Sequence, residues 1–119
     1  MVDTNRARPA DLAAVRNVLD GGLLQVTDLP AAVDRGDVLT AVSATDTVLG
    51  ALVLAGTEIT AVAVRRRRRG QGVGTALVGA AAREREGLVA EFDERVRPFW
   101  RSVGFDTEPI GDGRYRGWY

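Results

Sequence analysis

The chain of 119 residues contains no cysteine, no histidine and no lysine. Without cysteine there is no disulfide, no thiol nucleophile and no zinc–thiolate site. Without histidine there is no imidazole base, no Ser-His-Asp triad and no histidine-ligated metal. Without lysine there is no Schiff base and no lysine of a Walker-type phosphate loop. Chemistry is left to carboxylates, hydroxyls, guanidinium groups and backbone amides, and we expect no metal.

Long apolar runs are also missing. No segment approaches the ~18 apolar residues that a membrane span needs, so we expect no membrane partner. The first residues do not combine a basic segment with an apolar one, so no secretion signal is predicted and a cytoplasmic location is expected. The length, with 45% hydrophobic and 27% charged residues, fits one globular domain over residues 1–119.

All the basic residues are arginine, and the sixteen of them balance sixteen acidic residues. Five of these arginines are consecutive, at 65–69. Such a run can bind nucleic acid. The zero net charge and the lack of interleaved aromatic residues, which would stack on bases, disfavour nucleic acid as the main partner.

The first half of the chain predicts two helices followed by strands. The first helix begins near Pro9 and ends at Gly21-Gly22, and the second has Asp28 as its N-cap and ends at Gly36. Apolar strands at 38–42, 47–54 and 57–64 are joined by short turns, which makes them an antiparallel meander. The polar segment 3–8 would add only a short edge strand.

The second half predicts a helix over 73–86, a strand over 88–92, a helix from Asp93 through Val103 interrupted by Pro98, and two short strands around a turn at 111–113. A strand, a loop, a helix and a strand in that order make 57–64 and 88–92 parallel. The fold class is therefore α/β of the α+β kind, with a mixed, mostly antiparallel sheet flanked by helices.

Gly70, Gly72 and Gly74 alternate where the helix over 73–86 begins. Glycine allows a ligand to approach the backbone closely, and a helix start offers unpaired N–H groups and the positive end of the helix dipole. The pattern predicts an anion site, most naturally for phosphate. The spacing is not that of a dinucleotide fingerprint. The residues alone also allow a second interpretation, in which the segment is a glycine-rich turn without a ligand and the neighbouring arginines are simply exposed to solvent.

Two motifs in the second half of the chain resemble those of a known family. The run Arg69-Gly70-Gln71-Gly72-Val73-Gly74 follows an Ala/Val-rich strand and matches the pattern Arg/Gln-x-x-Gly-x-Gly/Ala. This run looks like motif A of the GCN5-related N-acetyltransferases, the GNAT superfamily. The run Phe99-Trp100-Arg101-Ser102-Val103-Gly104-Phe105 resembles the Phe-Tyr-x-x-x-Gly-Phe segment that ends the last helix of the family. The order of elements matches too, so the resemblance covers nearly the whole chain and implies a compact GNAT fold.

The resemblance implies an enzyme that moves an acetyl group from acetyl-CoA to a primary amine by direct attack in a ternary complex. Acetyl-CoA, the co-substrate, would lie where strands 57–64 and 88–92 splay apart. Its pantetheine arm would pair with the backbone of Val62 and Val64, and backbone donors near Val64 would polarise the carbonyl. Arginines of the 65–69 run would reach phosphates. The pyrophosphate would be held by the backbone amides of Arg69, Gly70, Gln71, Gly72, Val73, Gly74 and Thr75.

Direct transfer needs a base for the amine proton and an acid for the leaving thiolate. Glu58 is the predicted base, because some family members carry a glutamate at this place on the strand. Strict alternation would put Glu58 on one face with Thr60, Val62 and Val64, and a solvent-exposed glutamate is the alternative reading. The family often has a tyrosine as the acid where this chain has Trp100, whose indole N–H cannot serve as a proton donor near pH 7.

The acceptor, a small-molecule or protein amine, is expected between residues 10–36 and the C-terminal hairpin. Asp28, Asp34 and Asp37 would attract a cationic amine or simply lie on the surface. Asp93 replaces a family asparagine and is expected to cap a helix. Trp118 and Tyr119 are expected to close a sheet or to form a homodimer contact. Two other functions remain open: a catalytically weak acyl-CoA-binding protein of the same fold, which Trp100 favours, and an Arg-rich nucleic-acid-interaction module.

Overall fold

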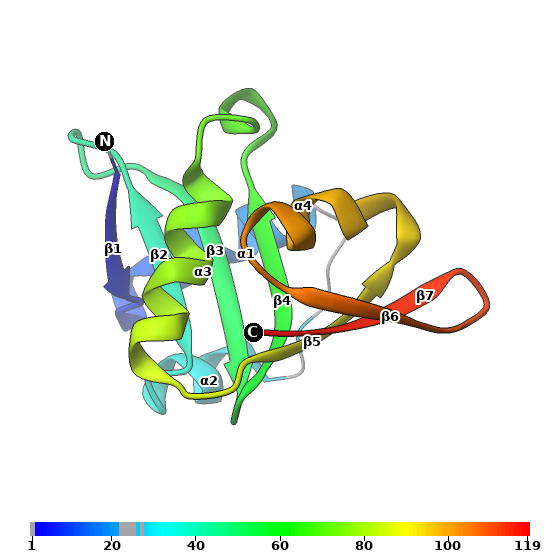
Figure 1. The fold of residues 1–119 in the computed structure, drawn as a ribbon. Helices are drawn as coiled ribbons and strands as arrows, with labels where there is room; N and C mark the ends of the chain where they lie inside the picture. The colour runs from blue at the N-terminus through cyan, green and yellow to red at the C-terminus, as the bar shows by residue number, and fades with distance from the viewer. Residues whose placement is uncertain (1, 22–25, 27) are drawn as a thin grey trace.

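The computed structural model describes residues 2–21, 26 and 28–119. In this part of the chain, seven strands form one sheet in the order β1-β2-β3-β4-β5-β7-β6, with helices on both faces (Figure 1). The strands are β1 (Asp3–Arg6), β2 (Val38–Val42), β3 (Val48–Ala55), β4 (Glu58–Val64), β5 (Val89–Asp93), β6 (Asp106–Gly111) and β7 (Arg114–Trp118). The helices are α1 (Leu12–Gly21), α2 (Leu29–Asp34), α3 (Val73–Glu84) and α4 (Arg97–Ser102), with 3₁₀ turns η1 (Pro9–Asp11), η2 (Arg66–Arg68) and η3 (Glu94–Val96).

The strand pairing confirms the predicted sheet. β1 to β4 form an antiparallel meander, in which β1 is the short edge strand expected from its polar sequence. β4 and β5 are parallel, because α3 carries the chain back across the sheet between them. β7 pairs antiparallel with both β5 and β6. The C-terminal strand β7 therefore lies between β5 and β6. Trp118 is opposite Val89 on one side and Asp106 on the other, so it helps to close the sheet at this point.

Each face of the sheet has its own core. α3 and α4, in front of the sheet in Figure 1, cover a core that includes Leu52, Leu77 and Trp100. α1 and α2 cover the other face, where Val15 and Val53 are buried among small apolar side chains. β3 serves both cores, since seven of its eight residues are buried and successive side chains point to opposite faces.

The ends of the helices follow local sequence signals, with one correction. Asp28 caps α2 as predicted, and its carboxylate accepts a hydrogen bond from the N–H of Ala31. The prediction of one helix from Asp93 to Val103 is wrong, because the segment is the turn η3 followed by α4. Pro98 lies in the first turn of α4, where no N–H is needed, so it begins a helix instead of interrupting one. Gly22, predicted as part of the stop of α1, lies outside the described residues.

Candidate functional site

The parallel pairing of β4 and β5 is very short. Only Glu58 with Val89 and Ile59 with Ala90 are opposite one another. Beyond these pairs β5 turns away from β4 (Figure 1), and the described structure gives the rest of β4 no strand partner on that side. This is the splayed pair that the sequence predicted between 57–64 and 88–92.

The backbone of Val62 and Val64 faces this opening. The N–H of Arg65 donates to the carbonyl of Leu49 over 2.8 Å, and residues that exchange hydrogen bonds with a neighbouring antiparallel strand alternate. Ala61 and Ala63 therefore direct their backbone groups toward β3, and Val62 and Val64 direct theirs toward the gap beside β5. The carbonyl of Val64 already accepts a hydrogen bond from Nε of Arg69, at 3.2 Å.

A β-bulge at Thr60 corrects the predicted faces of β4. Val53 pairs with Ala61, but Leu54 pairs with Ile59, so Thr60 is an extra residue. The alternation is shifted by one position there. Ile59 joins the α3 core, against which Val62 and Val64 also pack. Glu58, next to Ile59, points to the opposite face, which α1 and α2 cover; the prediction that Glu58 shares a face with Val62 and Val64 is wrong.

The glycine-rich loop leads directly into α3. Gly70 and Gly72 have φ values of 76° and 83°, and no heavy atom lies within 4 Å of where their Cβ would be. Gly72 is the N-cap of α3, so the next three N–H groups, of Val73, Gly74 and Thr75, have no partner within the helix. Such donors, together with the positive end of a 12-residue helix, favour an anion.

Gly74 is a glycine for a different reason. A Cβ at this position would lie 2.8 Å from Cε1 of Phe99. The Phe99 ring of α4 therefore packs directly on the first turn of α3, beside the end of β4. The predicted role of the Gly74 backbone at phosphate stays a prediction, but its lack of a side chain is explained by this packing.

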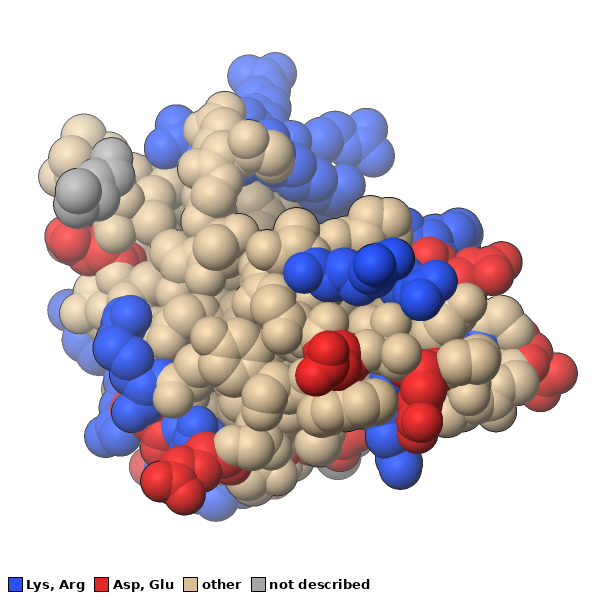
Figure 2. All heavy atoms as spheres, in the orientation of Figure 1, with Lys and Arg blue, Asp and Glu red and all other residues tan. Residues whose placement is uncertain are grey.

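The arginines of the run have different roles. Nε of Arg65 donates to the carbonyl of Val48 over 2.6 Å, and with Arg69 it fastens the loop to the end of the sheet. Arg66 and Arg67 are exposed, and Figure 2 shows blue side chains gathered at this end of the molecule. Arg68 lines a cavity of about 310 Å³, and its Nε is buried without a hydrogen-bond partner. The other residues around the cavity are Val2, Gln71, Gly72, Val73 and Ala76.

Sequence comparison supports this geometry. Residues 32–105, more than half of the chain, match the model of the acetyltransferase (GNAT) family. The chain belongs to this family. No protein of curated function matches it in sequence.

Solved structures share the GNAT fold. An acetyltransferase of the GNAT family from Bacillus cereus has a TM-score of 0.86 at 12% identity, over 100% of this chain and 96% of the other. Ard1 from Thermoplasma volcanium has a TM-score of 0.75 at 21% identity, over 99% and 96%. N-acetylglutamate synthase from Neisseria gonorrhoeae, complexed with coenzyme A and L-arginine, has a TM-score of 0.74 at 15% identity, over 91% of this chain and 28% of the other.

Trp100 lies in the core of this GNAT domain. Its side chain is 5% exposed, and its ring stacks on Phe92 at 5.2 Å between centroids. Phe99 and Phe105 meet it edge-on. The predicted core role of these aromatics is confirmed, and α4 presents no hydroxyl at this position.

Of the aspartates considered for the acceptor or the cofactor, Asp28, Asp37 and Asp93 have structural partners. The Asp93 carboxylate accepts a hydrogen bond from the N–H of Arg95 at 2.8 Å, which lowers the pKa of Asp93 and confirms its capping role. Asp37 is held by Arg35 and by Arg85. Arg85 also donates from Nε to the carbonyl of Gly56, which ties the end of α3 to the turn between β3 and β4. Asp34 is an exposed residue at the end of α2.

Sequence reasoning missed three charged residues on the α1 side of the sheet. Glu91 of β5, Arg116 of β7 and Glu108 of β6 lie side by side across three strands. Arg116 donates to Glu91 over 2.8 Å. The signal was present in the alternation of polar and apolar residues along β5 and the hairpin, which places all three on the face opposite Phe92.

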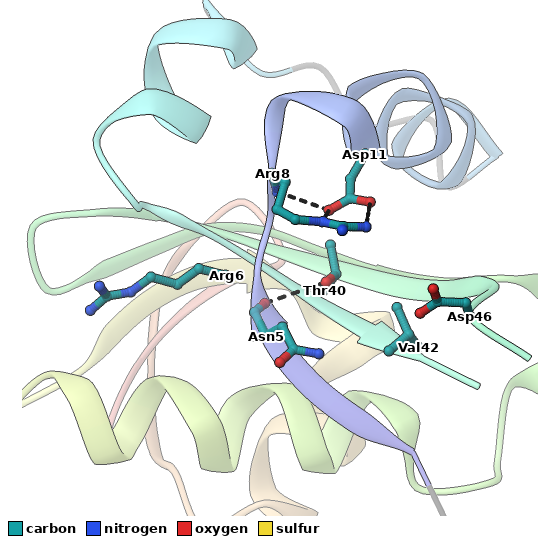
Figure 3. Close-up of a pocket in the computed structure, with 7 residues that line it drawn as sticks. All are labelled: Asn5, Arg6, Arg8, Asp11, Thr40, Val42 and Asp46. Carbon is teal, nitrogen blue, oxygen red and sulfur yellow. Dashed lines mark hydrogen bonds and ion pairs between the residues drawn. The ribbon is translucent and has the colours of Figure 1, made fainter. Parts of the chain in front are cut away.

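A second cavity, of about 380 Å³, lies at the β1 edge, away from the splayed strands. Figure 3 shows the Arg8 guanidinium turned onto the Asp11 carboxylate. These hydrogen bonds lower the pKa of Asp11 and raise that of Arg8. The two charges satisfy each other, and Thr40 donates to the carbonyl of Asn5. Arg6, which also lines the cavity, pairs with Glu84, so among the described residues Asp46 is the charged lining residue without an ion pair.

In the described part of the chain, no helix is long and apolar enough to cross a membrane.

Proposed function

We propose that the chain is an acetyl-CoA-dependent N-acetyltransferase that moves an acetyl group to a primary amine by direct attack in a ternary complex. The observation that carries this proposal is the backbone of Val62 and Val64, which has no strand partner on the β5 side in the described structure and leads to the glycine-rich start of α3. An extended pantetheine arm pairs with such a strand edge as an added strand would.

The donor set at the end of this line fits the phosphates of the co-substrate. Gly70 and Gly72 leave room for a ligand close to the backbone. The first N–H groups of α3 are positioned to hold a pyrophosphate. The unpartnered Nε of Arg68 in the adjacent cavity supplies a charged donor. Acetyl-CoA itself supplies the activated acetyl group as a thioester.

The acceptor reaches the thioester from the α1 side, because α3 and α4 fill the other face. The amine nitrogen forms a bond to the carbonyl carbon and the carbon–sulfur bond breaks. Glu58, which faces the α1 side, takes the amine proton directly or through a water. Water protonates the leaving thiolate, since Trp100 has no hydroxyl. The backbone near Val64 polarises the carbonyl.

Trp100 gives a specific reason to keep a second function: binding of acyl-CoA with weak catalysis. Its ring is packed against three other aromatics, so the position that commonly holds the acid in the family carries only an apolar contact.

Ligand binding and turnover separate these functions. We expect CoA to raise the melting temperature; a ligand at 100 times its Kd adds ~2.7 kcal/mol of stability. Gly72→Glu places a carboxylate at the anion site and should abolish this shift, and normal CoA binding by Gly72→Glu would refute the loop assignment. Thiol release in the presence of an amine panel identifies an enzyme, whereas CoA binding without thiol release identifies the weak binder.

The role of Glu58 is tested by pH. In Glu58→Gln we expect a lower transfer rate at neutral pH with CoA binding unchanged, because the amine loses its base. A rate equal to that of the wild type across the pH range would show that Glu58 is only a surface residue.

A further inference from the structure

Within residues 2–21, 26 and 28–119, one half of the sheet has no helix on its α1 side. The helix α4 covers one face of the strands β5, β7 and β6. There Nε of Arg97 donates a hydrogen bond to the hydroxyl of Thr107, and the ring of Trp100 stacks on that of Phe92. Their opposite face carries Val89, Glu91, Asp93, Asp106, Glu108, Arg114, Arg116 and Trp118, which we call the open face. Val89 and Asp93 are half-buried, and the others are exposed.

The strand register arranges the open face in rows. One row runs from Glu58 on β4 through Val89 and Trp118 to Asp106. The next row contains Glu91, Arg116 and Glu108. The bulge at Thr60 brings Glu58 onto this face, so the predicted base of the reaction lies at one end of a surface that reaches the outer edge of the sheet. Three interstrand steps of ~4.8 Å give it a width of about 14 Å.

Negative charge is in excess on this surface, because its carboxylates and that of Glu58 outnumber the guanidinium groups of Arg114 and Arg116. Arg116 is surrounded by the carboxylates of Glu91, Glu108 and Glu58, and its hydrogen bond with Glu91 and their charges raise the pKa of its guanidinium. Asp106 adds a further carboxylate in the neighbouring row. Trp118 is 39% exposed beside these acids, and an exposed indole attracts a cation over its ring. The surface is thus complementary to a partner with several positive charges.

The shape of the open face favours a chain over a small molecule. Small ligands bind in concave sites that enclose most of their surface. Here the side chains of Glu91 and Arg116 are 38% and 54% exposed even while paired with each other. Four or five residues of an extended peptide, at ~3.4 Å each, span the 14 Å between β4 and β6.

We propose that the acceptor is an amine of a basic polypeptide segment, which lies across the open face with its amine at Glu58 and its positive side chains over Glu91, Glu108, Asp106 and Trp118. This inference rests on the proposed N-acetyltransferase function. It assigns the substrate class and makes Glu108 and Trp118 specificity residues at a distance from the chemistry.

Synthetic hexapeptides with a free N-terminal amine and an internal lysine test the proposal: one rich in arginine, one rich in glutamate and one neutral, with spermidine as a small polycation. Acetyl transfer and peptide binding are both measured, the latter by fluorescence anisotropy of labelled peptides. The informative variant is Glu108→Arg, which reverses one charge on the open face. Asp3→Arg makes the same change on β1 at the opposite edge of the sheet, and CoA binding is followed in both.

We expect the arginine-rich peptide to be the best substrate and the tightest-binding peptide, with an affinity that falls as salt rises. Glu108→Arg should raise its KM about fivefold or more, because it replaces attraction by repulsion, with kcat and CoA binding retained, and Asp3→Arg should leave the KM unchanged. Equal use of the three peptides, preference for spermidine, or an unchanged KM in Glu108→Arg would overturn the inference while leaving the N-acetyltransferase intact. Charge-dependent peptide binding without acetyl transfer would instead refute the proposed function, while it would support the open face as a docking surface for basic peptides.

Discussion

Gly50 allows α3 to pack closely on the sheet, and its replacement is the sharpest structural test of the site. A Cβ at Gly50 would lie 2.9 Å from the carbonyl oxygen of Ala63, 3.0 Å from Cγ1 of Val73 and 3.1 Å from Cδ1 of Leu77. The first contact is with backbone and cannot be relieved by a rotamer change. The other two belong to α3, so Gly50→Ala must move α3 away from β3.

The magnitude follows from the cost of overpacking. An extra methyl group in a filled core costs about 1–3 kcal/mol. For a domain of this length, each kcal/mol lowers the melting temperature by about 4 °C, which gives a fall of about 4–12 °C. Because Val73 is the first residue of α3, we also expect a smaller stabilisation by CoA.

Gly79→Ala is the matched control. The nearest atom to its added Cβ is Nη1 of Arg83, at 3.9 Å, an ordinary contact. Alanine within a helix is favoured over glycine by about 0.8–1 kcal/mol, so this variant should melt above the wild type. Thermal unfolding followed by circular dichroism measures both variants. If Gly50→Ala melts with the wild type while Gly79→Ala behaves as expected, the close packing of α3 on β3 is wrong.

Two further predictions concern Trp100 and Asp11. Trp100→Phe should destabilise the protein by about 1–3 kcal/mol by leaving a gap in the aromatic cluster, yet keep the acetyl-transfer rate at saturating substrate; a tenfold slower rate in a folded variant would assign Trp100 a part in the chemistry. Asp11→Asn should be less stable than the wild type at neutral pH, because the folded-state pKa of Asp11 is lowered by Arg8. This difference in the free energy of unfolding is fully present above about pH 4, the pKa of aspartate in the unfolded chain. It shrinks as the pH falls through the lowered pKa of Asp11 in the folded protein. Urea unfolding measures the difference, and a difference that does not change with pH would contradict this linkage.

Most of the fold could be predicted from the sequence because its signals are local. The short turns after Val42 and Ala55 require an antiparallel meander, and the helix between 57–64 and 88–92 requires a parallel pair. Asp28 and Asp93 act as caps through their own neighbouring N–H groups, so their roles were visible without a tertiary structure.

What could not be predicted depends on contacts between distant segments. The bulge at Thr60 is one extra residue in a strand whose sequence, Glu-Ile-Thr-Ala-Val-Ala-Val, contains no glycine or proline to mark it. Only its pairing with β3 shows that the alternation is shifted at Ile59. The need for glycine at position 74 likewise comes from Phe99, twenty-five residues later, and the open face combines strands whose order in the sheet differs from their order in the chain.

The absence of cysteine and the arrangement of the proposed site on both faces of the sheet both favour the proposed direct transfer. The serines of the chain are Ser43, in the turn between β2 and β3, and Ser102, which donates to the carbonyl of Phe99 in α4. Both hydroxyls take part in local hydrogen bonds, since that of Ser43 accepts from the N–H of Thr47. The glycine-rich loop belongs to the α3 side of the sheet, Glu58 faces the α1 side, and the backbone of Val62 and Val64 lies between them. The donor and acceptor that we propose would enter from opposite faces and meet at this gap, and this arrangement favours the proposed direct transfer over a covalent acyl-enzyme.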